Sequence, residues 1–348
     1  MSLGSLRRDA RALVRLAKLE YEHGGGVSPS MLRRGFLSNR RYFYPGIEDR
    51  SVPFVSDVAV HMHSHRLNTT TGRALVRHKH VFAEALLARG LADFAPETYG
   101  LVTRRGLLAR SGDAAERLRA QDMVVLKPWV GLGGTAVRLA PAQEVFDLTV
   151  RQGQELVVQE RLVQHPDLRP INPHALNTAR LLTVRLPDGP VVAAASHRWG
   201  TERSGAVDNV ASGGLTSSVD KETGRLGPAT ETVHGRQVIS HDRHPETGVQ
   251  VAGVVLPQWA EVRDLALRLM NAFPELDHVG WDIAVTDRGP RVVEGNAGMP
   301  ALTPFQLSGS FLRDDHLRAF YIRHGMLPAR YATWSDPQQS VAQPGAQA

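Results

Sequence analysis

The sequence has 348 residues, of which 42% are hydrophobic and 22% charged, a composition typical of a globular protein. It contains no cysteine, which excludes disulfides, thiolate catalysis and cysteine-bound zinc. The net charge of +6 favours anionic ligands, whereas 6% aromatic residues and the lack of a basic stripe argue against nucleic acid as a partner. No apolar run is long enough for an integral membrane segment. The absence of cysteine fits a cytoplasmic protein, which we expect, and the sequence leaves the oligomeric state open.

A basic amphipathic helix is predicted at the N-terminus. Apolar residues recur near helical spacing between arginines, at Leu3, Leu6, Leu13, Val14 and Ala17. We expect a surface helix packed on its own domain, with a membrane-surface or partner contact as the alternative. No uninterrupted apolar run follows the arginines, so we expect no secretory signal.

Histidines are dense between His61 and His80. On a strand, His61, His63 and His65 would share one face and could hold a metal. No acidic residue accompanies them in this segment, which favours scattered surface or cleft histidines over a metal site.

Further along the chain, strands predominate over helices. A helix is predicted from Lys79 to Gly90, and a second, amphipathic helix begins at Pro257. Apolar and β-branched runs predict strands at 122–127, 155–160, 179–186, 191–197, 279–285 and 290–294. Because strands outnumber βαβ crossovers, the pattern favours an α+β fold with mixed sheets.

The turn Asp287-Arg288-Gly289 separates two strand-like runs and predicts a hairpin. If the hairpin is centred on Arg288, Asp282 lies opposite Glu294, and Asn296 points to the same face. Two opposed carboxylates repel each other, and a divalent cation between them removes that cost. Their oxygens suit Mg²⁺, which usually completes its shell with phosphate oxygens and water. The alternative is a solvated acidic hairpin bridged by an arginine.

A second signal is Lys127, which ends the strand at 122–127 before a glycine-rich turn. A lysine here can hold phosphate oxygens by charge, while Gly131, Gly133 and Gly134 let backbone N–H groups approach. The order is not that of a Walker A motif, in which the lysine follows the glycines. The alternative is an ordinary hairpin loop.

These residues resemble the ATP-grasp superfamily, and within it the sugar-transfer-associated ATP-grasp group. The likeness runs from about residue 79 to residue 308 and includes several motifs in the expected order. They are Arg77-His78-Lys79 with Pro96, Lys127-Pro128 with the glycines, residues 157–160, residues 176–180, Asp208-Asn209 with Gly213-Gly214, His244-Pro245 with Thr247-Gly248, Gly280-Trp281-Asp282, and Glu294-Gly295-Asn296.

The resemblance implies an ATP-grasp fold, in which two α+β subdomains clasp a nucleotide, here with an N-terminal helical extension. The division it suggests is an extension at 1–75, a small lid subdomain at 76–158, a catalytic subdomain at 159–328 and a disordered tail at 329–348. Lys79, Lys127, Gly133 and Gly134 would contact the phosphates of ATP. Glu160 and the backbone near Leu162 would hold adenine and ribose, and Asp282, Glu294 and Asn296 would hold Mg²⁺.

The function implied is an ATP-dependent carboxylate–amine ligase that acts on small molecules through an acyl phosphate. The tetrahedral oxyanion then needs fixed positive donors, for which Arg180 and Arg198 on the predicted central hairpin are candidates; the alternative is a pair of surface strand cations. The polar segment 204–218 is a candidate flap over the acceptor, with Asp208, Asn209, Gly213 and Gly214 as substrate-binding residues, or else a flexible loop. A kinase acting on a hydroxyl acceptor and a non-catalytic nucleotide-binding protein are the other functions we consider.

Overall fold

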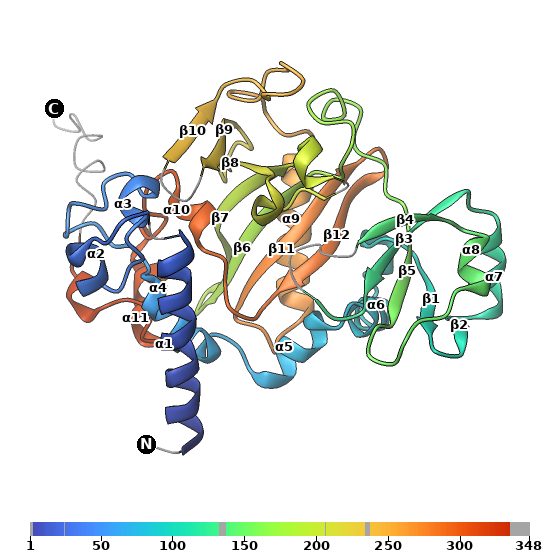
Figure 1. The fold of residues 1–348 in the computed structure, drawn as a ribbon, viewed down its shortest axis with the longest axis horizontal. Helices are drawn as coiled ribbons and strands as arrows, with labels where there is room; N and C mark the ends of the chain where they lie inside the picture. The colour runs from blue at the N-terminus through green and yellow to red at the C-terminus, as the bar shows by residue number, and fades with distance from the viewer. Residues whose placement is uncertain (1–2, 24, 132–136, 206, 234–236, 335–348) are drawn as a thin grey trace, which may run out of the picture.

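A computed structural model describes residues 3–23, 25–131, 137–205, 207–233 and 237–334, which form two antiparallel sheets surrounded by helices (Figure 1). The predicted α+β class is confirmed. Gly133 and Gly134 lie outside the described residues, as does the predicted tail from residue 335 onwards. The first part of that predicted tail contains the 3₁₀ helix η5, Ala329–Tyr331, in which Tyr331 is buried and donates a 3.0 Å hydrogen bond to the carbonyl of Arg50.

The smaller sheet has five strands in the order β2-β1-β5-β3-β4. One face carries an apolar core that includes Val124 and Leu126 of β3 and Leu118 of α7. Because side chains alternate along a strand, Val125 and Lys127 point to the other face, away from this core. The elements of this part are β1 Thr98–Thr103, β2 Gly106–Ala109, α7 Gly112–Arg119, β3 Met123–Pro128, β4 Arg138–Pro141, α8 Glu144–Asp147 and β5 Leu156–Glu160.

The larger sheet has seven strands in the order β10-β9-β8-β7-β6-β11-β12. The amphipathic helix predicted from Pro257 is α9, Trp259–Ala272, whose Val262 and Leu265 pack on one face against Leu181 and Trp281. The strands are β6 Thr178–Leu186, β7 Gly189–Trp199, β8 Leu215–Val219, β9 Leu226–Val233, β10 Gln237–His241, β11 His278–Thr286 and β12 Gly289–Asn296.

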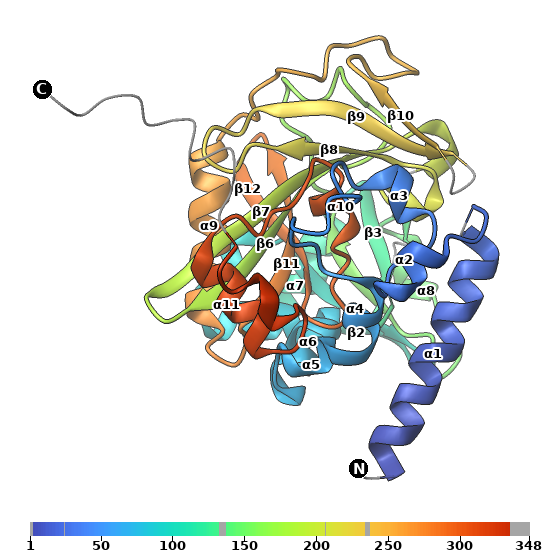
Figure 2. The ribbon, with the colours of Figure 1, turned by 90° about the vertical axis from the view of Figure 1, so that its left-hand side faces the viewer.

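Residues from both ends of the chain cover the opposite face of this sheet (Figure 2). Leu182 and Val184 of β6 form a second core there with Val55, Leu302 and Phe320. Arg180 lies two residues before Leu182, and every second side chain of a strand shares a face, so Arg180 lies on this face too. The helices on this side are α1 Leu3–His23, α2 Pro29–Arg33, α3 Arg40–Phe43, α4 Asp57–His63, α10 Thr303–Gln306 and α11 Asp315–Arg323. Helices α5 Thr70–Arg77 and α6 Lys79–Ala88 instead pack in the same core as α9.

The predicted N-terminal helix is present as α1 and packs against α4, but it buries other residues than those of the predicted apolar stripe. Leu13 and Val14 are 56% and 71% exposed, and helix α1 instead buries Ala12 and Leu16. A basic helix offers more than one weakly apolar stripe, and contact with α4 decides which one is covered. His61 and His63 lie on a helix rather than a strand.

The described residues include no group of three or more His, Asp or Glu side chains placed to hold a metal ion. Nor do they include a helix long and apolar enough to span a bilayer.

Candidate active site

The hairpin β11–β12 places Asp282 opposite Glu294, as its predicted register requires. The turn is tighter than predicted, because Thr286 pairs with Gly289, which adopts a φ of 95° that favours glycine. A β-bulge lies between the pairs Ile283–Val292 and Asp282–Glu294, so one additional residue of β12 restores the predicted register beyond it. The predicted pairing of Asp282 with Glu294 is therefore confirmed, although the pairs nearer the turn are shifted by one residue from the predicted register.

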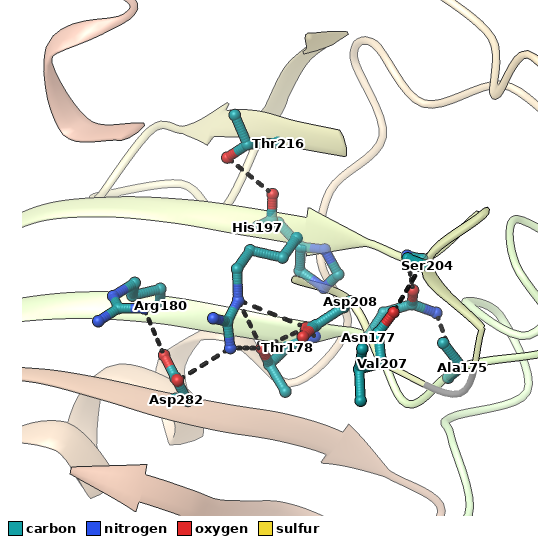
Figure 3. Close-up of polar contacts among 12 residues, drawn as sticks. Ala175, Asn177, Thr178, Arg180, His197, Ser204, Val207, Asp208, Thr216 and Asp282 are labelled. Carbon is teal, nitrogen blue, oxygen red and sulfur yellow. Dashed lines mark hydrogen bonds and ion pairs between the residues drawn. The ribbon is translucent and has the colours of Figure 1, made fainter. Parts of the chain in front are cut away.

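Asp282 is buried and sits between two arginines, Arg180 on the neighbouring strand β6 and Arg198 on β7, the next strand beyond it (Figure 3). Its Oδ2 lies 2.9 Å from Nη2 of Arg198, and its Oδ1 lies 3.6 Å from Nη1 of Arg180. Asn296 donates a 3.3 Å hydrogen bond from Nδ2 to Oδ2 of Asp282, which confirms that both side chains share a face. These contacts arise because β11 pairs with β6, and β6 with β7.

Arg198 also joins Asp282 to a second buried carboxylate, that of Asp208. Its Nε lies 3.5 Å from Oδ2 of Asp208, and its Nη2 donates a 2.7 Å hydrogen bond to Oγ1 of Thr178. Asp208 in turn accepts hydrogen bonds of 2.8 and 2.6 Å from the amide and hydroxyl of Thr178. The predicted flap residue Asp208 is thus held against the central strands (Figure 3).

Burial and these charges shift the pKa values in opposite directions. Burial raises the pKa of Asp208, and Arg198 opposes that shift by favouring the charged carboxylate. Burial alone would lower the pKa of Arg198, but Asp208 and Asp282 outweigh it and raise that pKa. The guanidinium therefore stays charged between the two carboxylates.

Two lysines face the hairpin from the side of the smaller sheet. Lys127 is buried, and burial together with the charge of Lys79 lowers its pKa to about 8, although Glu294 opposes the shift. Lys79 is the first residue of α6, and its Nζ donates a 3.3 Å hydrogen bond to the carbonyl of Gly131. Burial raises the pKa of Glu294, and Lys79 and Lys127 act against this. The lysines and Glu294 are thus electrostatically coupled across the space between the sheets.

That space is a cavity of about 790 Å³ lined by residues of both sheets. The structure brings most of the predicted site residues together there: Lys79, Lys127, Glu160, Leu162, Arg180, Arg198, Asp208, Asn209, Asp282, Glu294 and Asn296.

Three predicted residues have surroundings that the sequence did not indicate. Gly213 and Gly214 are not among the described lining residues: a Cβ on Gly213 would meet the side chain of Arg203, and one on Gly214 would meet backbone oxygens. Glu160 lines the cavity but forms an ion pair with Arg288 at the hairpin turn.

The donor set of the hairpin fits a hard divalent cation. Oδ1 of Asp282 is buried without a hydrogen-bond donor in the described part of the chain, and Glu294 and Asn296 offer further oxygens on the same face. With only two carboxylates and one amide, the site would need oxygens from a bound ligand to complete an octahedron.

The sequence did not predict one wall of the cavity. Arg15, Arg40, Asp57 and His61 line it from the N-terminal region, together with the segment 299–303 that follows β12. The only local signal was Ser56-Asp57 at the start of α4, where the hydroxyl of Ser56 accepts a 3.2 Å hydrogen bond from the amide of Ala59. Such a cap predicts a helix but not its position beside the site.

The two sheets with a cavity of lysines and carboxylates between them have the architecture of an ATP-grasp protein. The sequence profile of the sugar-transfer associated ATP-grasp family matches residues 142–319, about half of the chain, and the chain belongs to this family. Comparison with curated protein sequences found no match.

Solved structures of several ligases are similar to the chain. D-alanine–D-alanine ligase from Bacillus anthracis is 13% identical with a TM-score of 0.37, over 67% of this chain and 60% of that protein. VanG D-Ala:D-Ser ligase from Enterococcus faecalis is 12% identical with a TM-score of 0.39, over 73% and 64%. The ATP-grasp ligase PsnB is 16% identical with a TM-score of 0.35, over 70% and 59%. Each match covers less than two thirds of the other protein.

Proposed function

We propose that this protein is a Mg²⁺- and ATP-dependent ligase that joins a carboxylate to an amine through an acyl phosphate. The observation that carries the proposal is a single cavity in which Lys79 and Lys127 face the carboxylates of Asp282 and Glu294. Lysines and a divalent-cation site on opposite walls are what a triphosphate requires, because its charge must be neutralised from several sides.

In this proposal the nucleotide lies between the sheets. Lys79, Lys127 and the glycines Gly133 and Gly134 hold its phosphates, and residues 160–162 hold adenine and ribose. Asp282, Glu294 and Asn296 hold Mg²⁺, which when bound neutralises charge on the phosphates. Burial favours this role for Lys127, since a desolvated ammonium group gains more from an anion than an exposed one does.

The reaction begins when a substrate carboxylate oxygen attacks the γ-phosphorus, whose bond to ADP breaks. The amine nitrogen then attacks the acyl carbon, phosphate leaves with the bonding electrons, and the nitrogen loses a proton. Nε of Arg180 is buried and has no hydrogen-bond acceptor among the described residues, so Arg180 can donate to the developing oxyanion. Nε and Nη2 of Arg198 already contact Thr178 and the two carboxylates, so we assign Arg198 the positioning of Asp282.

The segment that contains Asp208, Asn209, Gly213 and Gly214 is proposed to bind the acceptor. Asn209 lines the cavity beside Asp208, and Asp208 ties this segment to the strand that carries Thr178. The hydrogen bonds between Thr178 and Asp208 would hold the segment beside the reacting groups.

The test is phosphate release from Mg-ATP with a panel of paired carboxylates and amines, with the product identified by mass spectrometry. Asp282→Asn and Glu294→Gln should each abolish turnover without unfolding the protein, whereas Asp287→Asn, an exposed acid in the same hairpin, should retain it. Unchanged turnover in either of the first two variants would refute the metal assignment. A stable phosphorylated product would instead identify a kinase, and nucleotide binding without turnover on any pair would point to a non-catalytic protein.

A further inference from the structure

The N-terminal region forms part of the cavity wall instead of lying apart from it. Its own apolar core includes Phe43, Tyr44 and Phe54, and the last two rings stack at 5.6 Å. This unit is fastened to the segment after β12, because Gln306 exchanges hydrogen bonds of 2.9 and 3.2 Å with the backbone of Val55. The hydroxyl of Tyr44 donates a 3.2 Å hydrogen bond to Thr303. The region is therefore fixed next to the segment that begins at Asn296.

This wall lies on the same sheet face as the reacting groups. Val55 and Ala59 pack with Leu182, which is two residues from Arg180 on β6 and shares its face. In Figure 1 the N-terminal helices and the smaller sheet lie at opposite ends of the molecule, with the larger sheet between them. One cavity thus extends from the lysines at the nucleotide end to the N-terminal wall.

Arg40 is held rigidly in this wall. Its Nε and Nη2 donate hydrogen bonds of 2.7 to 3.1 Å to the carboxylate of Asp57, and both side chains are nearly buried. Asp57 also accepts a 2.9 Å hydrogen bond from the amide of Leu37. Nη1 of Arg40 has no acceptor among the described residues, so both of its N–H groups remain for a ligand.

Two further groups lie beside Arg40. His61 is four residues after Asp57 on α4, hence on the same helix face, and Arg15 reaches the cavity from α1. All three side chains line the same cavity, and burial and the charges of Arg15 and Arg40 lower the pKa of His61, against the opposing charge of Asp57. A neutral imidazole beside two guanidinium groups can still donate a hydrogen bond to an anion.

The charges of the cavity also indicate a second anion. Arginines and lysines outnumber carboxylates by nine to five among the described lining residues. Bound Mg²⁺ would neutralise part of the negative charge of a triphosphate. The nucleotide alone therefore leaves the positive charges at the N-terminal end of the cavity without an anion.

We propose that Arg15, Arg40 and His61 form a subsite for a carboxylate or phosphate group on the ligase's second substrate, separate from the carboxylate that is activated. The inference rests on the proposed function, since it assigns this end of the cavity to the co-substrate. It predicts that the co-substrate carries at least one negative charge in addition to its reacting group.

The test uses the full chain saturated with Mg-ADP, into which inorganic phosphate and, separately, succinate are titrated by calorimetry. We expect one of these anions to bind, and the one that does identifies the group. Arg15→Gln should weaken this binding about five-fold, the effect of one partly exposed charge, and should leave Mg-ADP affinity unchanged. Arg15 is exposed, so its replacement should not disturb folding.

Arg11→Gln is the matched control, because Arg11 is an exposed arginine one turn earlier in α1 that does not line the cavity. It should bind the anion as the unmodified protein does. Arg40→Lys keeps a positive charge beside Asp57 but loses the planar set of guanidinium N–H donors, so it should also weaken binding of the anion. Equal affinity in the Arg15 and Arg11 variants, or no binding of either anion, would overturn the subsite. Failure of the unmodified protein to bind Mg-ADP would instead overturn the proposed function.

Discussion

Replacing Arg198 with methionine tests whether one cation holds both buried carboxylates of the site. The change keeps the approximate length of the side chain but leaves Asp208 and Asp282, 7% and 3% exposed, without the guanidinium between them. Removing one partner of a buried ion pair costs about 3–5 kcal/mol, because the remaining charge stays desolvated. We expect a loss of that size in the free energy of unfolding, measured by urea denaturation with circular dichroism.

Arg203→Met is the control, since Arg203 is an exposed arginine whose ion pair with Glu231 should contribute less than about 1 kcal/mol. The double variant Arg198→Met, Asp208→Asn should recover part of the lost free energy of unfolding, because it removes one of the two buried carboxylate charges that no longer contact Arg198. A loss in Arg198→Met no larger than that in Arg203→Met would refute the reasoning.

The same variant has a predictable pH dependence. Burial already raises the pKa of Asp208, and loss of Arg198 raises it further because the charged carboxylate loses its partner. A carboxyl group whose folded-state pKa exceeds its unfolded value binds more protons when folded, so its protonation stabilises the fold as pH falls. The difference in stability between the variant and the unmodified protein should therefore be larger at about pH 7.5 than at about pH 5.5. An equal difference at both values would contradict this account.

Other predictions concern the nucleotide and the packing of helix α5. Lys127→Met should weaken the affinity for Mg-ADP at least ten-fold, which corresponds to the roughly 1.4 kcal/mol or more of one charge-assisted contact. The affinity for adenosine, measured in the same fluorescence titration, should change little, and an equal loss for adenosine would contradict the phosphate contact. Because the pKa of Lys127 is about 8, the affinity of the unmodified protein for Mg-ADP should fall as pH rises through that value, and the variant should show no such step. Gly72→Ala should destabilise the protein by about 1–3 kcal/mol in thermal unfolding, since the added Cβ would lie 2.4 Å from the carbonyl oxygen of Glu275. Gly112→Ala, also helical but with open space around it, should change stability by less than about 1 kcal/mol.

Local patterns in the sequence were sufficient for much of the fold. The alternation of apolar residues around the Asp287-Arg288-Gly289 turn fixed the faces of β11 and β12, and with them the shared face of Asp282, Glu294 and Asn296. This worked because strand alternation has a period of two and a bulge on β12 compensated for the tighter turn. The apolar stripe after Pro257 likewise predicted α9, whose amphipathic period is a local property.

Only the tertiary structure decided what those side chains contact. The sequence suggested Arg180 and Arg198 as oxyanion donors, but the strand order β7-β6-β11 places both beside Asp282. Strand order depends on the burial of whole sheet faces, and no window of neighbouring residues contains that information.

The N-terminal region shows the same limit. Its first helix was predicted, but helices α2 to α5 were not. Nor was the face that α1 buries, because a basic helix with few large apolar residues takes its orientation from its neighbours. Nothing near Arg40 or Asp57 in the sequence indicates the cavity that they line, since the packing of Val55 and Gln306 across some 250 residues brings them there. The sequence by itself thus determined the strands β3, β5, β6, β7, β11 and β12 and the shared face of Asp282, Glu294 and Asn296, whereas contacts between distant segments determined which charges share the cavity.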